Sequence, residues 1–106
     1  MKLDKKKEVK YYRMAADRGH AKAQFNLGNC FRKGYCVAQD AAEAFRYLKL
    51  AADQGYSAAE HNLAVLYENG EGVARDVAEA TRWYERAAAK GHDKAKAVLA
   101  ERRGLT

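Results

Sequence analysis

The sequence repeats itself at an interval of about 36 residues, and this period constrains the fold more than any other feature of the chain. Residues of one kind recur at matching positions of successive units: Gly19, Gly55 and Gly91; Leu27, Leu63 and Leu99; and the aromatic residues Tyr11, Tyr47 and Trp83. Between residues 11–46 and 47–82, roughly 16 of 36 positions are identical. Such self-similarity is typical of solenoids, in which each unit buries its apolar face against its neighbours.

Each unit contains two stretches whose apolar residues have the spacing of one face of an α-helix. In the first stretch these residues are Ala59, Leu63, Leu66 and Tyr67, and in the second they are Ala44, Tyr47, Leu48 and Ala51. Both stripes combine large side chains with alanines, which lets neighbouring helices approach closely. The pattern predicts an all-α protein of about six antiparallel helices, near residues 5–17, 21–33, 41–53, 57–69, 77–89 and 93–103.

Residues that commonly begin and end helices stand at the ends of these stretches. Asp40 and Asp76 share a repeat position with Asp4, and we expect them to cap the second helix of each unit. A glutamate follows each of them as in a capping box, and Ser57 with Glu60 offers the same box for a first helix. Positive φ is expected at the glycines after the alanine-rich helix ends: Gly19, Gly55 and Gly91.

At 106 residues the chain is long enough for one domain with one core. No apolar stretch reaches the ~18 residues that cross a bilayer, and the basic start lacks the apolar run of a secretory signal, so we expect no membrane insertion. Two cysteines cannot build a disulfide framework. The cytoplasm is therefore the expected compartment, unless a signal peptide upstream of the given sequence directs the protein to the periplasm or out of the cell.

The net charge of +6 is concentrated at the two ends of the chain. Residues 1–34 carry most of the positive excess, residues 35–76 have an acidic balance, and the C-terminal end is basic again. In a stacked array the end units face water, and charged outer faces keep them soluble. Binding of nucleic acid or of another anionic surface through the basic ends is the alternative interpretation, but we do not expect nucleic acid to be the main partner.

The repeat begins and ends in mid-unit. Residues 1–106 are expected to form a single domain with a half repeat at 4–18, complete repeats at 19–54 and 55–90, and a half repeat at 91–103. Half units leave a helix exposed at each end of the stack, which predicts a weak homodimer formed through the end helices.

Two motifs stand out at these repeat positions: Ala21-Lys22-Ala23-Gln24-Phe25-Asn26-Leu27-Gly28 and Gly70-Glu71-Gly72-Val73. Together with Asp76, Ala80, Trp83-Tyr84 and Ala87-Ala88, they resemble the pattern of the Sel-one-like repeat, a relative of the tetratricopeptide repeat. The resemblance covers the chain from about Asp4 to about Leu99. It implies a right-handed α-α superhelix that binds other proteins as a scaffold or adaptor, and in bacteria many such proteins act in signalling, host interaction or cell-envelope assembly.

The chain departs from that family's pattern at a few positions. Ala64 replaces the glycine that follows leucine, which we expect to widen one helix contact. Cys36 replaces the second glycine of the Gly-x-Gly loop, and we expect a different local turn there. Phe45 and Thr81 share a variable position, which we expect to face outward.

The cysteines and histidines have simpler explanations than metal binding or catalysis. Cys30 shares a position with a core leucine, where cysteine acts as a small apolar residue. Cys30 and Cys36 together provide too few ligands for zinc. We expect His20 and His92 to lie at helix starts in packing roles, and His61 to be an ordinary surface residue.

The recurring aromatic residues are expected in the core rather than stacked on nucleic-acid bases: Tyr11, Tyr12, Tyr47, Trp83 and Tyr84. The chain has no phosphate-binding loop, no serine nucleophile in a sharp turn and no cluster of metal ligands in its sequence. We therefore expect neither an enzyme nor a bound cofactor or metal.

The resemblance implies that the first helices of successive units line the concave face of the solenoid. Asn26 and Asn62 share a repeat position there, and their amide groups can bond a peptide backbone. The basic side chains would suit an acidic segment. The alternative is that these are solvated helix residues or that the asparagines support the loop. The residues expected to contact a partner are Lys22, Phe25, Asn26, Asn29, Arg32, Lys33, His61, Asn62, Val65 and Glu68.

The sequence thus predicts a scaffold that holds another protein or peptide, acidic in part, on its concave face. A further alternative is a cell-envelope protein related to the cysteine-rich Sel-one-like repeat proteins. Those relatives pair cysteines within each repeat, and this chain lacks that pattern.

Overall fold

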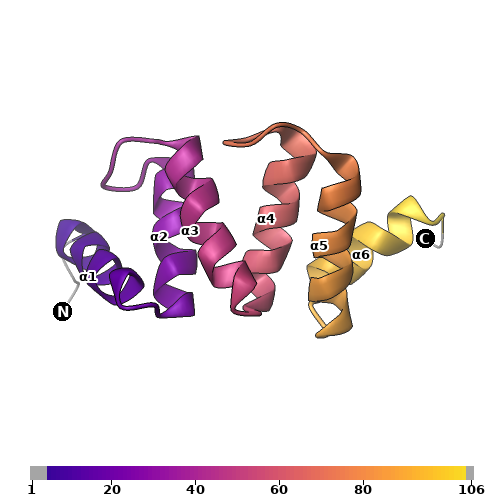
Figure 1. Ribbon diagram of the computed structural model, residues 1–106, viewed down its shortest axis with the longest axis horizontal. Helices are drawn as coiled ribbons and strands as arrows, with labels where there is room; N and C mark the ends of the chain where they lie inside the picture. The colour runs from indigo at the N-terminus through magenta and orange to yellow at the C-terminus, as the bar shows by residue number, and fades with distance from the viewer. Residues whose placement is uncertain (1–4, 105–106) are drawn as a thin grey trace.

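The computed structural model describes residues 5–104, and these residues form six α-helices joined by short connections (Figure 1). The helices lie in chain order along an elongated solenoid, 45 × 26 × 24 Å along its principal axes, with α1 and α6 at opposite ends. The predicted all-α fold is confirmed, and the helix bounds differ from those predicted only at the last residue of α6. The helices are α1 (Lys5–Asp17), α2 (Ala21–Lys33), α3 (Ala41–Asp53), α4 (Ser57–Asn69), α5 (Val77–Ala89) and α6 (Asp93–Arg102).

Aspartate side chains cap α3 and α5, as predicted. The carboxylate of Asp40 accepts a hydrogen bond from the backbone N–H of Glu43 (3.1 Å), and Asp76 accepts one from Glu79 (3.0 Å). The glutamates do not return the bond, because the N–H groups of both aspartates donate to carbonyls of the preceding first helix. Asp4, at the same repeat position, lies outside the described residues.

The capping box predicted at Ser57 is wrong. Ser57 is the first residue of α4, and the N-cap position before it belongs to Tyr56, whose side chain makes no capping bond. The carboxylate of Glu60 does not turn back to the helix start, because it is bound by Lys90 (Nζ–Oε2 2.6 Å). The helix is therefore held at this end by packing rather than by a side-chain cap.

The glycine positions behave as predicted, but the turn at Cys36 does not. Gly19, Gly55 and Gly91 have φ values of 89°, 85° and 88°. Cys36 has a φ of 57°, close to the 71° of Gly72 at the same repeat position, so the local turn is retained rather than changed. A residue with a Cβ is strained in this conformation, and Cys36 is the only described non-glycine residue that adopts it.

The core is a row of buried side chains between successive helices, formed by the stripes of the sequence. Gly28 lets α2 and α3 approach closely, because a Cβ at this residue would lie 2.7 Å from Cγ of Leu48. The rings of Phe31 and Tyr47 stack almost in parallel, with centroids 5.9 Å apart. Cys30 is buried and unpaired, as predicted. Each large apolar side chain buried here stabilises the fold by about 1.5–3 kcal/mol; they include Leu27, Leu48, Leu63, Leu66, Trp83 and Tyr84.

Tyr11 and Phe45 differ in exposure from what their repeat positions predict. Tyr11 is 75% exposed, whereas Tyr47 at the same repeat position is 3% exposed. Tyr47 is covered by α2, but no helix precedes α1 within the described residues. Phe45, predicted to face outward, is half-buried and meets the ring of Tyr67 edge-on at 5.4 Å. Burial in this array therefore depends on the neighbouring unit as much as on repeat position.

A polar pair joins consecutive units at two equivalent places. The Gln54 amide donates to the side-chain oxygen of Gln24 (2.8 Å), and Lys90 makes the equivalent contact with Glu60. Gln24 and Glu60 are both buried. Oε1 of Glu60 has no hydrogen-bond partner among the described residues. The ammonium of Lys90 is therefore the main group that offsets the negative charge of this buried carboxylate.

We expect Lys90→Ala to lower the free energy of unfolding by about 2–3 kcal/mol, because it leaves the Glu60 carboxylate buried without a cation. The double variant Glu60→Gln/Lys90→Gln copies the Gln24–Gln54 pair and should recover most of the loss. Urea denaturation followed by circular dichroism measures both values. Wild-type stability in Lys90→Ala, or a double variant no more stable than the single one, would contradict this account.

Candidate functional site

The residues predicted to contact a partner lie on one surface, which α2 and α4 form and α6 continues. The amide of Asn62 on α4 donates to the side-chain oxygen of Asn29 on α2 (3.0 Å), and Arg102 of α6 forms an ion pair with Glu68 of α4. Two lysines on this surface are exposed, and the other residues are half-buried. We call it the first-helix face and define it by Lys22, Phe25, Asn26, Asn29, Arg32, Lys33, His61, Asn62, Val65 and Glu68.

A hollow of about 220 Å³ opens at the α1 end of the first-helix face. It brings together three of the predicted residues, Asn26, Asn29 and Lys33. Amides, a lysine ammonium and tyrosine hydroxyls in one hollow can bond a peptide backbone and an acidic side chain. The remaining lining residues are Glu8, Tyr12, Cys30 and Tyr35.

Sequence reasoning missed the contributions of Glu8, Tyr12 and Tyr35 to this hollow. Tyr12 shares a repeat position with the buried Leu48, so the repeat predicts a core residue, yet Tyr12 is half-buried. Its hydroxyl donates to the Glu8 carboxylate (2.7 Å), and this bond, together with burial, raises the pKa of Tyr12 to about 12. The repeat carried no signal for this exposure, because a repeat position does not show whether a neighbouring helix covers the residue.

The two repeat-related asparagines have different surroundings. Asn62 is bonded to Asn29 and so ties two first helices together. Asn26 lines the hollow, and its side chain makes no hydrogen bond within residues 5–104. The sequence left two roles open for these asparagines, contact with a peptide and support of the structure. The bond of Asn62 to Asn29 fits a supporting role, and the accessible amide of Asn26 fits contact with a peptide.

Part of the positive charge on the first-helix face is compensated by neighbouring carboxylates. The Arg32 guanidinium donates two hydrogen bonds to Glu71 (3.3 and 3.2 Å), and this contact lowers the pKa of the Glu71 carboxyl. The Glu68 carboxylate accepts a bond from the Tyr84 hydroxyl (2.8 Å) in addition to its ion pair with Arg102. Lys22 and Lys33 are the exposed cations of this face.

The prediction that His61 is an ordinary surface residue is wrong. Its ring lies 4.9 Å from the ring of His92 and 5.4 Å from that of Tyr84, and its Nδ1 is buried with no partner among the described residues. Phe25 and Tyr56 form the equivalent ring pair one unit earlier, with centroids 5.2 Å apart. His61 thus occupies a packing position, which an apolar ring fills in the preceding unit.

The N-cap position before each first helix is held by His20, Tyr56 and His92, which confirms the expected helix-start role of the two histidines. At His92 the ring nitrogen accepts a hydrogen bond from the backbone N–H of Ala95 (3.4 Å).

Within residues 5–104 no three His, Cys, Asp or Glu side chains are grouped to hold a metal ion. No helix in this range is long and apolar enough to span a membrane.

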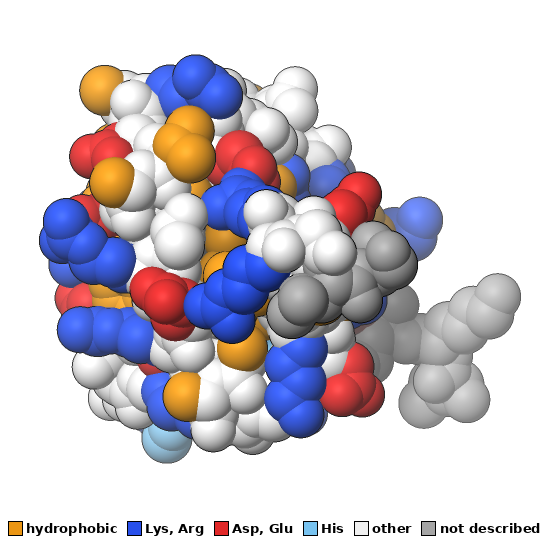
Figure 2. All heavy atoms as spheres, turned by 90° about the vertical axis from the view of Figure 1, so that its right-hand side faces the viewer, with side chains coloured by type: hydrophobic (Ala, Val, Ile, Leu, Met, Phe, Trp, Pro, Cys, Tyr) orange, Lys and Arg blue, Asp and Glu red, His pale blue; other side chains and the backbone are white. Residues whose placement is uncertain are grey.

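Basic side chains at the C-terminal end do not form an unbroken cationic patch. In Figure 2, which looks at the end formed by α5 and α6, blue Lys and Arg side chains alternate with red Asp and Glu side chains. Arg102 pairs with Glu68, and Arg103 lies 3.5 Å from Glu85. A surface of mixed charge attracts a phosphate backbone less strongly than the net charge of the chain alone suggests.

The stacked hairpins define a helical repeat protein of the solenoid class. Comparison with known families finds Sel1 repeats at residues 4–20, 21–56 and 57–92. The chain belongs to the Sel1 repeat family. Proteins of this family are typically non-enzymatic scaffolds that mediate protein–protein interactions.

Among curated proteins, the chain is similar to DAP3-binding cell death enhancer 1 of Rattus norvegicus, with 43% identity over 42 residues. This match covers 40% of the chain and 8% of the rat protein.

Solved structures support the same assignment. A Sel1 repeat protein from Oxalobacter formigenes has a TM-score of 0.85 and 40% identity, covering 88% of this chain and 70% of that one. A protective antigen of uropathogenic Escherichia coli strains, described as displaying an SLR fold, has a TM-score of 0.87 and 35% identity over 96% of this chain and 22% of its own. Cysteine-rich protein B of Helicobacter pylori shares the fold, with a TM-score of 0.86 and 22% identity over 91% and 72% of the two chains.

The packing of His61 has a consequence for stability as the pH falls. Burial first, and then the nearby His92, Lys94 and Arg32, lower the pKa of His61 to about 4. In the unfolded chain a histidine has a pKa of about 6.5, so below that pH the unfolded state binds a proton that the folded state excludes. The stability that His61 contributes is complete above pH ~6.5 and declines as the pH falls toward 4.

We expect the urea midpoint of the wild-type chain to fall more steeply between about pH 7 and about pH 5 than that of His61→Phe. Phenylalanine is the matched replacement, because Phe25 fills the equivalent position. The difference between the two pH profiles isolates His61 from the other titrating groups. Parallel profiles would show that His61 is not responsible.

Proposed function

We propose that this chain is a protein-interaction scaffold that holds an extended, partly acidic peptide segment on its first-helix face. The hollow between α1 and α2 carries the proposal. It places the amide of Asn26, which makes no hydrogen bond to another described residue, and the exposed ammonium of Lys33 beside the rings of Tyr12 and Tyr35. An amide pairs with backbone groups, a lysine with a carboxylate, and tyrosine rings with the apolar parts of side chains.

The rest of the face supports recognition less strongly, because its polar groups are already bonded. Arg32 is held by Glu71, and Asn62 is bonded to Asn29. A partner that uses these groups must replace one hydrogen bond by another, which contributes little net free energy. The α1 end of the face therefore supplies the anchor, and α4 extends the contact surface.

The comparisons support the general role. Sel1 repeats mediate protein–protein interactions, and the rat relative is named as a protein that binds DAP3. The matched segment of that relative is a small part of its length, so the shared element is the repeat itself. We assign to this chain a scaffold role without catalysis.

Affinity purification with mass spectrometry from the native cell would supply the partners, and each would then be titrated against variants. We expect Asn26→Ala/Lys33→Ala to weaken a direct protein partner at least about tenfold, because it removes both polar anchors of the hollow. Fluorescence anisotropy measures the affinity, and circular dichroism checks that the helices remain.

The matched control is Lys49→Ala/Arg82→Ala, which removes two cations from the second helices α3 and α5. It should leave the affinity unchanged. Unaltered binding to the Asn26→Ala/Lys33→Ala variant would refute the first-helix face as the site. Recovery of nucleic acid instead of protein, with affinity that falls steeply as salt is added, would favour the charge-based alternative.

A further inference from the structure

The second helix of each complete unit carries a stripe that is covered by the first helix of the same unit. In α3 this stripe is almost fully buried: Ala44 and Tyr47 cluster with side chains of α2, and Leu48 and Ala51 belong to the cluster that contains side chains of α4. In α5 the equivalent residues are buried against α4: Ala80, Trp83, Tyr84 and Ala87. At the same positions of α1, two side chains pack partly against α2, whereas no helix covers Tyr11 within the described residues. We call these positions the α1 stripe: Glu8, Tyr11, Tyr12 and Ala15.

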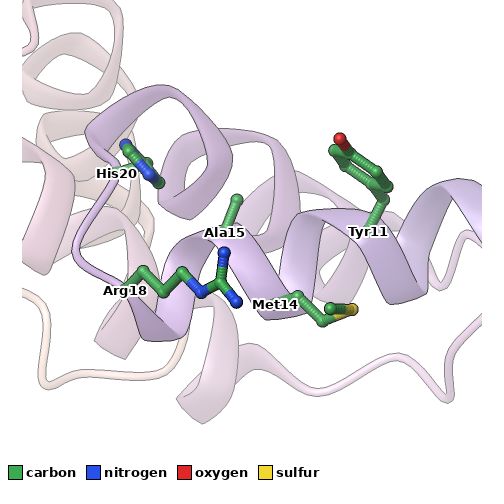
Figure 3. Close-up of a pocket in the computed structure, with 5 residues that line it drawn as sticks. All are labelled: Tyr11, Met14, Ala15, Arg18 and His20. Atoms are coloured by element: carbon green, nitrogen blue, oxygen red, sulfur yellow. The ribbon is translucent and has the colours of Figure 1, made fainter.

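The α1 stripe is hollowed and largely apolar. One hollow, of about 370 Å³, lies over Tyr11 and Tyr12 and is bounded by Lys7 and Glu8. A second, of about 220 Å³, lies on the other side of Tyr11, beside Met14, Ala15, Arg18 and His20 (Figure 3). Tyr11 is 75% and Met14 52% exposed, the two largest exposures among the described large apolar residues. The stripe thus offers a ridge of apolar side chains between two hollows.

Cations dominate the rim of this surface. Lys7, Lys10 and Arg18 are exposed around the stripe, and Figure 3 shows the Arg18 guanidinium extending along α1 toward Met14. The only carboxylate in the stripe belongs to Glu8, which accepts a hydrogen bond from Tyr12. Apolar contacts in the centre with positive charges at the edge suit a partner that is apolar along one side and acidic along its flanks.

We propose that the α1 stripe is a second docking site, which borders the hollow of the first-helix face at Glu8 and Tyr12 and is centred on Tyr11, and that it takes an acidic amphipathic α-helix of a partner protein. The shape of the occupant follows from the interfaces already in the structure. The equivalent stripes of α3 and α5 are each covered by a helix of 13 residues, α2 and α4. A partner helix on α1 would repeat this packing of one helix on another at the α1 end of the array.

A second copy of this chain fits the stripe less well than an acidic helix does. End-to-end stacking would bring α6 of one copy onto α1 of the next, but none of the exposed large apolar residues lies on α6. The α6 end carries Lys94, Lys96 and Arg103 beside the exposed carboxylates Asp93 and Glu101, so it offers the cations of the α1 rim a mixed charge, whereas an acidic helix offers them a negative one.

The chain itself supplies the template for a probe. A labelled peptide with the sequence of α4, residues 57–69, keeps the apolar side that covers the equivalent stripe of α5. Ala58→Glu and Asn62→Glu make this peptide more acidic, and Ala58→Lys, Asn62→Lys and Glu68→Lys give a basic peptide with the same apolar side. Fluorescence anisotropy with the full chain then compares the two peptides, and circular dichroism detects helix formation on binding.

We expect the acidic peptide to bind saturably with a Kd below about 1 mM and the basic peptide to bind at least about tenfold more weakly. Tyr11→Ala should weaken the acidic peptide at least about fivefold, and Lys7→Glu/Arg18→Glu about tenfold or more. Tyr11, Lys7 and Arg18 are exposed, so these variants should keep the wild-type helix content. The matched control is Leu50→Ala, which removes an exposed apolar side chain from α3 and should change nothing.

Several results would overturn the proposal. They are the absence of saturable binding by the acidic peptide, equal binding of both peptides, and unchanged binding to Tyr11→Ala. Self-association of the chain in analytical ultracentrifugation, abolished by Tyr11→Ala, would assign the stripe to a second copy instead. Asn26→Ala/Lys33→Ala should bind the acidic peptide as the wild-type chain does, so failure of this site and failure of the first-helix face are distinguishable.

Discussion

No helix of this chain can bury its apolar stripe alone, and the rest of the structure depends on the contact between each helix and the next. Alanines allow the close approach, as at Ala44, Ala51 and Ala80, which are fully buried. Aromatic rings add further packing between neighbouring helices, as in the parallel stack of Phe31 and Tyr47. Because each unit touches only its neighbours, stability adds up along the array, and the end helices are the least supported.

The fold was predictable because the signals that define it are local and repeated. A helix begins where Asp40 or Asp76 can accept a backbone hydrogen bond, and it ends before a glycine such as Gly55 that adopts positive φ. Each signal occurs in more than one unit, so a misleading residue in one copy is outweighed by the others. Cys36 illustrates this, since the loop keeps its turn although the glycine is missing.

The site was only partly predictable, because its contacts join residues that the repeat does not relate. Helix periodicity selected Asn29, Arg32 and Asn62 as surface residues, but not the bonds that occupy them. Those bonds reach side chains in the next unit, such as Glu71, whose identity at that position is not repeated. Tyr11 differs from its prediction for another reason: the repeat assigns it to the core, but no helix covers it within the described residues.

The two candidate surfaces differ in what they can contribute to binding. On the first-helix face a ligand would have to exchange hydrogen bonds with groups such as Arg32 that already have partners, so the net gain in free energy per contact would be small. On α1 the ring of Tyr11 is uncovered, and its burial would contribute apolar free energy without breaking an existing contact. The first-helix face would then contribute mainly specificity, and the α1 stripe mainly affinity. If two segments of one partner bound these two surfaces, binding of the first segment would raise the effective concentration of the second.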